Sequence, residues 1–156
     1  MMKQFIALAR SEDGTSIVEM GFAAPILSLL LIGMVDMSRA YSAKLQLEQV
    51  AQRTIEKVQN ADYVESADYK TALKAEAAAA AEVSTTAVTI NSWTECNNNG
   101  TKLAFTTSCS NVDDPYARYV EVSIDKTYTP MFKTRFAGAR ADGTYNLTGK
   151  AGVRIQ

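Results

Sequence analysis

The feature that most constrains this chain is an apolar stretch near its N-terminus, Gly14 to Val35, which reads GTSIVEMGFAAPILSLLLIGMV. It holds one carboxylate, Glu19, and no charged residue stands from Met20 to Val35. Counted from Thr15 the stretch has 21 residues, and a helix of that length rises about 30 Å, which is the thickness of the hydrocarbon layer of a bilayer. The alternative is the core helix of a soluble protein, but such helices usually carry polar residues in every turn. The stretch therefore predicts a membrane-spanning helix.

The residues on either side of this stretch indicate how it is processed. After Val35 the chain continues Asp36-Met37-Ser38-Arg39, which is unlike the small-residue cleavage site that follows the apolar part of a secretory signal. Instead Gly14 stands directly before the stretch, and Glu19 follows that glycine by five residues. This G-x-x-x-x-E spacing ahead of an apolar helix is typical of a prepilin peptidase substrate, which is cut after the glycine on the cytoplasmic side and keeps its apolar helix.

The N-terminal third of the chain resembles a known family. Residues 10–41, RSEDGTSIVEMGFAAPILSLLLIGMVDMSRAY, resemble the N-terminus of the TadE-like family, minor pilins or pseudopilins of the tight adherence (Tad, Flp-type) pilus systems. Where the processing motif of this group has an aromatic residue after the glutamate, this chain has Met20. The Tyr-Thr-Pro at 128–130 also resembles the family. The matching N-terminal features are Gly14, Val18-Glu19, Pro25 ahead of the leucine run, and the sequence Gly33…Asp36…Arg39.

This resemblance implies a structural, non-enzymatic protein that prepilin peptidase cuts between Gly14 and Thr15. It implies three kinds of partner: the peptidase, other Tad pilins and minor pilins, and the inner-membrane assembly platform. We expect a single pass through a bacterial inner membrane, with the N-terminus cytoplasmic and the C-terminal domain periplasmic or carried into an extracellular pilus. Two alternatives are an uncleaved assembly factor that stays in the inner membrane, and a membrane-tethered ligand-binding module.

Glu19 has two interpretations, which are compatible with each other. Ser16 and Glu19 fit the capping-box pattern of a helix start. After cleavage behind Gly14, however, the carboxylate lies about one turn inside the bilayer, where a charge needs a partner. The resemblance to type IV pilin-like proteins implies that the partner is the free α-amino group of Thr15 on a neighbouring subunit. Further along, Pro25 removes a backbone hydrogen bond inside the apolar helix and predicts a kink there.

Composition argues against several functions. The chain has no histidine, which removes the commonest general base and metal ligand at neutral pH. It has no Gly-rich phosphate loop, no C-x-x-C and no H-E-x-x-H motif, so we expect neither enzymatic activity nor a cofactor. The net charge of −1 offers no basic surface for nucleic acid. One oxygen-rich turn, with Asn111, Asp113 and Asp114, is a weak calcium candidate; it lacks the EF-hand spacing, and solvated turn residues are the main expectation.

The two cysteines, Cys96 and Cys109, both follow the membrane stretch. If the peptidase motif places the N-terminus inside, both cysteines face an oxidising compartment. We therefore expect an intrachain disulfide between them.

The pattern after Val35 predicts an α+β protein in which a long transmembrane and stem helix packs on a small antiparallel sheet, as in type IV pilins. Residues 37–59 contain no proline or glycine, and one helix is expected from about Ser16 to Gln59. Its stem part should bury one face in the C-terminal domain, because apolar residues recur there at three- and four-residue spacing. These residues are Leu47, Ala51, Ile55 and Val58.

The C-terminal domain should contain a second helix and then strands. The second helix is expected at 65–83, at the surface, because its alanine run is a strong helix former with little side chain to bury. From Ser84 on, alternation predicts antiparallel strands at 87–93, 103–108, 118–128 and from Thr144, with one buried face. The predicted divisions are a leader (1–14), a transmembrane helix (15–36), an amphipathic stem helix (37–60) and an α+β domain (61–156).

Overall fold

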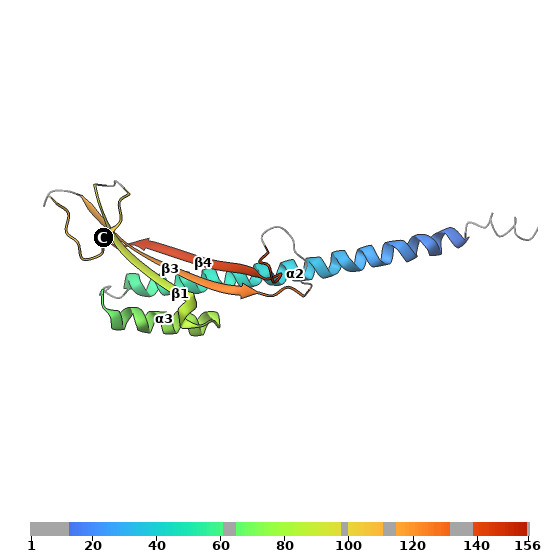
Figure 1. The fold of residues 1–156 in the computed structure, drawn as a ribbon, viewed down its shortest axis with the longest axis horizontal. Helices are drawn as coiled ribbons and strands as arrows, with labels where there is room; N and C mark the ends of the chain where they lie inside the picture. The colour runs from blue at the N-terminus through green and yellow to red at the C-terminus, as the bar shows by residue number, and fades with distance from the viewer. Residues whose placement is uncertain (1–12, 61–64, 98–99, 111–114, 132–138, 156) are drawn as a thin grey trace, which may run out of the picture. The chain divides into compact units, whose positions relative to one another are not determined.

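The computed structural model describes residues 13–60, 65–97, 100–110, 115–131 and 139–155. Two helices, α2 (Asp13–Asn60) and α3 (Ala67–Ala81), and a short 3-10 turn, η1 (Thr85–Ala87), precede four strands. The chain divides into two compact units, Met1–Arg39 and Ala40–Gln156. The first contains the N-terminal part of α2. The second, which we call the head, contains the rest of α2 and all the other elements of Figure 1.

The head contains one antiparallel sheet in the order β2-β1-β3-β4. Its strands are β1 (Val88–Cys96), β2 (Leu103–Ala104), β3 (Tyr116–Tyr128) and β4 (Tyr145–Arg154). The long strand β3 lies between β1 and β4, with Val122 opposite both Ile90 and Ala151. Alternate residues of β1 and β3 are buried (Val88, Ile90, Val120, Val122 and Ile124). This confirms the α+β architecture and the one-sided burial that the alternation predicts.

The C-terminal part of α2 packs on the buried face of this sheet, as its apolar spacing predicts. Leu47 and Ala51 are fully buried, and Val58 is 1% exposed. Together with Val50, Thr54 and Ile55 they form one stripe along the helix. Burying each large aliphatic side chain contributes roughly 1.5–3 kcal/mol, so this stripe is a major source of the head's stability.

One glycine sets how closely α2 approaches the sheet. A Cβ atom placed on Gly149, in β4, would lie 2.4 Å from the backbone carbonyl carbon of Leu47 and 2.6 Å from its carbonyl oxygen. Real Cβ atoms do not approach other atoms so closely, so the backbones of α2 and β4 meet only because position 149 has no side chain. Glycine in a strand interior commonly marks such an approach.

Helix α3 is shorter than the predicted helix at 65–83, and more of its alanine run is buried than expected. Ser66 caps its N-terminus by accepting a hydrogen bond from the backbone N–H of Tyr69 at 3.2 Å, and Glu82 closes its C-terminus in the left-handed conformation (φ 55°). The helix lies at the surface, as expected, but one face is buried. The residues of that face are Leu73, Ala77, Ala78 and Ala81. Alanine contributes to the core here because its small side chain lets the helix backbone lie close to its neighbours.

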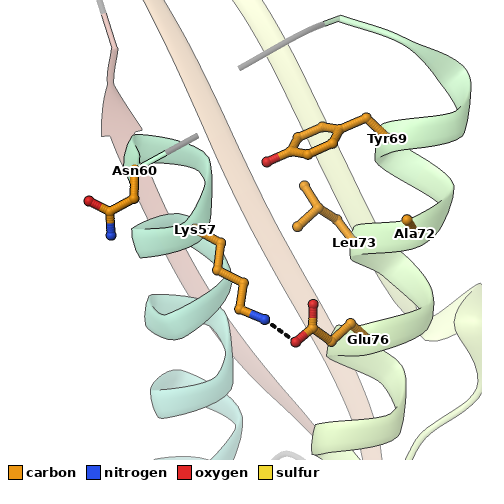
Figure 2. Close-up of a pocket in the computed structure, with 6 residues that line it drawn as sticks. All are labelled: Lys57, Asn60, Tyr69, Ala72, Leu73 and Glu76. Atoms are coloured by element: carbon orange, nitrogen blue, oxygen red, sulfur yellow. Dashed lines mark hydrogen bonds and ion pairs between the residues drawn. The ribbon is translucent and has the colours of Figure 1, made fainter. Parts of the chain in front are cut away.

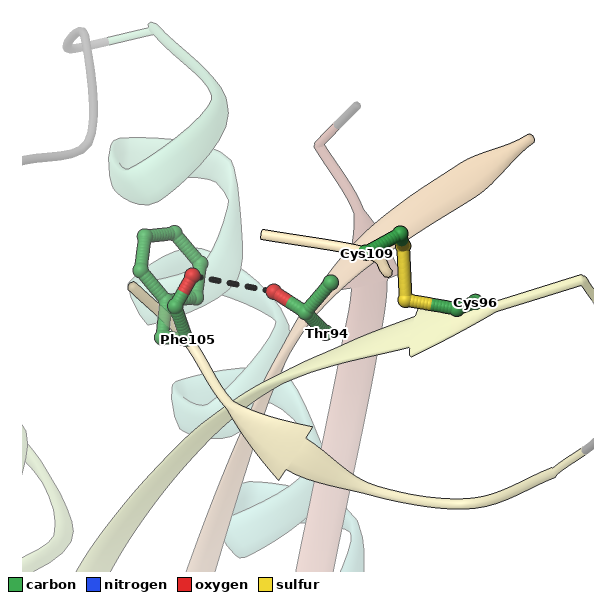
Figure 3. The surroundings of a disulfide bond; sticks show 4 residues. All are labelled: Thr94, Cys96, Phe105 and Cys109. Carbon is green, nitrogen blue, oxygen red and sulfur yellow. Dashed lines mark hydrogen bonds between the residues drawn. A yellow bond between two sulfur atoms is a disulfide. The ribbon is translucent and has the colours of Figure 1, made fainter. Parts of the chain in front are cut away.

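Of the second predicted strand, 103–108, only the first two residues form a strand in the structure. Strand β2 pairs Leu103 with Thr94 and ends at Ala104. The chain then turns, because the Thr107 N–H donates to the carbonyl oxygen of Ala104 at 2.8 Å. The Thr94 hydroxyl, on β1, donates to the carbonyl of Phe105 at 2.9 Å (Figure 3). These contacts hold the segment beside β1 without extending the sheet.

The expected disulfide between Cys96 and Cys109 is present, with the two Cα atoms 5.8 Å apart (Figure 3). It ties the end of β1 to the segment that follows β2. Replacing Cys96 by serine should lower the head's free energy of unfolding by about 3 kcal/mol, because the unfolded chain regains the entropy of an open loop. Cys109→Ser should give the same loss in a denaturant melt, since it removes the same bond. An unchanged melt for either variant, with two titratable thiols in the wild type, would show that the bond does not form.

The turn that leads into β4 contains a carboxylate with a perturbed pKa. Hydrogen bonds from the Thr144 hydroxyl (2.7 Å) and backbone N–H (3.0 Å) lower the pKa of Asp142, and the charge of Arg140 adds to this effect. A lowered folded-state pKa stabilises the fold above the unfolded value of about 3.8, and this stabilisation is lost as the pH falls through the folded pKa. Asp142→Asn should therefore reduce the drop in melting temperature on acidification. An identical pH profile for both proteins would contradict this role.

Candidate membrane-anchor and assembly segment

The N-terminal unit exposes apolar side chains on every side of its helix. Among the described side chains of residues 18–39 none is buried. Phe22 is 74% exposed, and Leu29 and Met34 are 67% and 68% exposed. The other large apolar residues that are exposed in this segment are Val18, Met20, Ile26, Leu27, Leu30, Leu31, Val35 and Met37. A surface helix of a soluble domain would have covered one side of such a stretch.

The environment that suits this surface is a bilayer or the apolar helices of other chains. The described helix from Val18 to Asn60 contains a strongly apolar stretch of 18 residues, and none of that stretch is buried. It is long and apolar enough to cross a membrane by length and composition. The alternative of a core helix finds no support, because the described part of the chain places no side chains over this stretch. One apolar helix near the N-terminus fits single-pass membrane anchoring.

The predicted processing and pairing residues lie in the first turns of α2. The helix already includes Asp13 and therefore runs through Gly14, Thr15 and Ser16. In the uncut chain Ser16 is thus an interior residue of the helix instead of its N-cap. Glu19 lies one turn further on; it is exposed, and it has no hydrogen-bonding or ionic partner within the described residues. Its carboxylate is therefore available to a group from another molecule, and pairing with Thr15 of a neighbouring subunit remains a prediction.

Pro25 lies inside α2, as predicted. Gly21, whose carbonyl would otherwise accept a hydrogen bond from position 25, has open space where a Cβ would stand. The Ser28 hydroxyl donates to the carbonyl oxygen of Ala24 at 2.8 Å, which gives this hydroxyl a partner inside an apolar segment. The kink itself stays a prediction.

The polar clusters of the head hold elements together. Lys70 pairs with Glu65 and donates to the Ser92 hydroxyl at 2.8 Å, while that hydroxyl donates to the other oxygen of Glu65 at 2.8 Å. A serine beside a lysine is a nucleophile only if the lysine is neutral; here Lys70 is the cation of an ion pair. The network links the start of α3 to β1. No group of metal-binding side chains occurs among the described residues, and Asn111, Asp113 and Asp114 lie outside them.

A shallow groove of about 400 Å³ lies between the end of α2 and α3. Figure 2 shows Lys57 of α2 and Glu76 of α3 forming an ion pair across it. The remaining lining residues are Asn60, Tyr69, Ala72 and Leu73. Both ion-pair partners are about half exposed, so the pair contributes little to stability.

The fold of the head and the exposed apolar segment of α2 together define a class of protein. It has an α+β, pilin-like architecture, and its N-terminal apolar helix fits a single membrane pass. A comparison with protein families adds a match over the N-terminal third of the chain. Residues 14–55 match the family model described as TadE-like protein. These residues comprise the apolar helix and the first buried turns of the stem, and over them the resemblance that the N-terminal motifs predict is confirmed. The match connects the chain to the Tad pilus system. No curated protein and no solved structure matches the chain.

Proposed function

We propose that this protein is a minor pilin or pseudopilin of a Tad-type pilus, cut by prepilin peptidase after Gly14 and assembled through α2. One observation carries the proposal: α2 runs through Gly14, and most of its apolar side chains from Val18 to Met37 are exposed, inside the segment that matches the TadE-like family. The peptidase, the other pilins and the inner-membrane assembly platform are the partners that this function requires.

The chemistry of Glu19 supports the assembly step. Cleavage after Gly14 creates a free α-amino group on Thr15, which is a cation in the same apolar layer as the Glu19 carboxylate. Each charge alone is costly there, and pairing them between neighbouring subunits removes both costs. Glu19 is exposed in the structure, so its carboxylate is accessible to a group from a neighbouring subunit.

The apolar surface of α2 supports the transfer from bilayer to filament. In lipid it contacts acyl chains, and in a filament it would contact equivalent helices, so transfer exchanges one apolar environment for another at little cost in hydration. The head folds around its own core and does not need to rearrange in this step. We therefore assign the protein a structural role without catalysis or a cofactor.

Recovery of the protein with filaments tests this function. In a strain with a working Tad system, the tagged protein should be found in the sheared filament fraction, and deletion of the prepilin peptidase should confine it to the inner membrane. The alternative is an uncleaved assembly factor anchored in the inner membrane. If the protein stays in the membrane fraction while the major pilin is sheared off, that alternative holds and the pilin role is wrong.

A further inference from the structure

Strand β4 is an edge strand of the sheet in the head. Within the described residues it pairs with β3 alone, and the register is continuous from Tyr119 opposite Arg154 to Tyr128 opposite Tyr145. It has 10 residues and contains no proline. Edge strands of natural proteins are commonly shortened, bulged or interrupted by proline, because their unpaired backbone groups are a template for another strand. None of these three devices occurs in β4.

The hydrogen-bond pattern identifies the backbone groups of β4 that point away from β3. Ile155 donates its N–H to the carbonyl oxygen of Arg118 at 2.9 Å. Because an antiparallel ladder alternates, the odd-numbered residues of β4 direct their backbone groups to β3, and the even-numbered residues direct theirs the other way. We call these even-numbered residues the β4 edge: Asn146, Thr148, Lys150, Gly152 and Arg154. They extend over about 27 Å, and all but Thr148 are exposed.

The apolar core of the head is incompletely covered at β4. On the face of the sheet that packs on α2, the core residues of β3 are fully buried. These are Val120, Val122 and Ile124. The apolar side chains of β4 that pack against this core are only partly buried, namely Leu147, Ala151 and Val153. A further strand beside β4 would cover them if it carried apolar side chains on the same face.

The opposite face of β4 is polar, and β3 shows which chemistry it accepts. The side-chain amide of Asn146 donates to the carboxylate of Asp125 at 3.2 Å, and the Thr148 hydroxyl donates to the same carboxylate. Glu121, also on β3, lies opposite Gly152. On its β3 side, the polar face of β4 is therefore lined by two carboxylates.

Two cations of β4 flank the position that β3 fills with a carboxylate. Lys150 and Arg154 lie two residues before and after Gly152, so both are diagonal neighbours of Glu121. Long side chains span such a diagonal. A carboxylate opposite Gly152 on a strand at the other side of β4 would be a diagonal neighbour of the same two cations.

The charges around β4 are positive in total. Residues 129–156 contain one carboxylate, Asp142, and five cations, which are Lys133, Arg135, Arg140, Lys150 and Arg154. Lys133 and Arg135 lie outside the described residues. With the two carboxylates of β3 included, five cations stand against three carboxylates. On α2, Lys44 and Glu48 flank Leu47, which meets Gly149, and they pair with each other at 3.4 Å. The excess of cations favours an acidic partner.

We propose that the β4 edge binds an extended segment of another protein as a further strand of the sheet. The segment presents acidic side chains on the polar face and apolar side chains on the face that packs on α2, and its backbone pairs with the five edge residues. A second copy of β4 lacks this chemistry, because it has two cations and no carboxylate, and like charges on neighbouring strands repel. This binding involves the head alone and does not depend on cleavage after Gly14.

Amide hydrogen exchange of the isotope-labelled, full-length protein in detergent micelles tests the proposal residue by residue. The probe is a synthetic peptide with the sequence of β3, Tyr116–Tyr128, because Glu121 and Asp125 give it acidic side chains on one face and valines and an isoleucine on the other. The control peptide has lysine at these two positions. Without peptide, the edge amides should exchange faster than the odd-numbered amides between them, which donate to β3.

We expect the β3 peptide, at about 1 mM, to slow exchange of the five edge amides about tenfold, which corresponds to a Kd of roughly 0.1 mM. The lysine peptide should leave their exchange unchanged. Lys150→Glu should reduce the slowing about threefold, because it makes an attractive diagonal repulsive. Lys74→Glu is the matched control: it makes the same charge change on α3, which contacts β1, and should leave the slowing intact.

Three results would overturn the proposal. One is an edge whose amides the β3 peptide does not slow. Another is equal slowing by the two peptides, which would remove the acidic partner. The third is a set of edge amides that already exchange as slowly as their neighbours without peptide, because the edge would then be covered by the protein's own chain or by a second copy. Repeating the measurement at a lower protein concentration separates these two covers, since only pairing between copies weakens on dilution.

Discussion

Gly149→Ala is expected to destabilise the head by about 3 kcal/mol, at the upper end of the cost of overpacking a core. The added methyl group would lie 2.4 Å and 2.6 Å from backbone atoms of Leu47, and 2.6 Å from its Cβ. A flexible side chain could move aside, but the backbone of a buried helix turn cannot do so without lifting α2 from the sheet. The measurement is a denaturant melt of the purified protein, with the free energy of unfolding extrapolated to water.

The same strand offers a matched control, three residues further on. A Cβ on Gly152 would have the Val120 carbonyl oxygen as its nearest neighbour, at 3.4 Å, which is ordinary contact. Alanine also constrains the unfolded chain more than glycine does, so Gly152→Ala should be neutral or stabilising by about 0.5 kcal/mol. Equal melts for the two variants would mean that α2 does not approach β4 as closely as described.

The second large effect is on assembly. Glu19→Ala should leave membrane insertion intact, because it makes the apolar segment more apolar, and should abolish piliation, because the Thr15 amine of the neighbouring subunit loses its partner. Alkaline extraction of membranes measures insertion, and electron microscopy with quantification of sheared pilin measures assembly. The control is Glu48→Ala in the same helix, where a half-exposed pair with Lys44 contributes only a few tenths of a kcal/mol.

Normal piliation by Glu19→Ala would eliminate the pairing role. A loss of piliation in both variants would point to a general effect of carboxylate removal on α2 and would equally contradict it. Only the combination of an unpiliated Glu19→Ala strain and a normally piliated Glu48→Ala strain agrees with a charge pair in the apolar layer.

Much of this architecture is readable from local patterns. The apolar run predicts an exposed helix because no side of it carries a polar stripe, and the three- and four-residue spacing from Leu47 to Val58 predicts the face that α2 buries. Alternation from Val120 to Ile124 predicts a half-buried strand. In each case the periodicity of hydrophobic residues determines which side chains leave water, and the structure buries or exposes them accordingly.

Features that depend on contacts between distant segments were not predicted. The early end of β2 coincides with the turn closed by the Thr107–Ala104 hydrogen bond, and the segment after it is joined to β1 by the Thr94–Phe105 hydrogen bond and the disulfide. The burial of Ala77 and Ala78 depends on the close approach of α3, which alanine permits but does not require. Gly149 and Gly152 both carry a signal, since a glycine in the middle of an alternating strand often marks a close backbone approach, but only the fold shows that Gly149 is the one that meets α2.

The central claim, a pilin-type subunit cut after Gly14, is tested most directly by the N-terminal residue of the protein isolated from membranes. Mass spectrometry of the intact protein, from strains with and without the prepilin peptidase, identifies that residue. We expect a mature chain that begins at Thr15 when the peptidase is present, and the full-length precursor when it is absent. A chain that still begins at Met1 or Met2 in both strains would contradict the account and would make the protein a permanent inner-membrane anchor for its head.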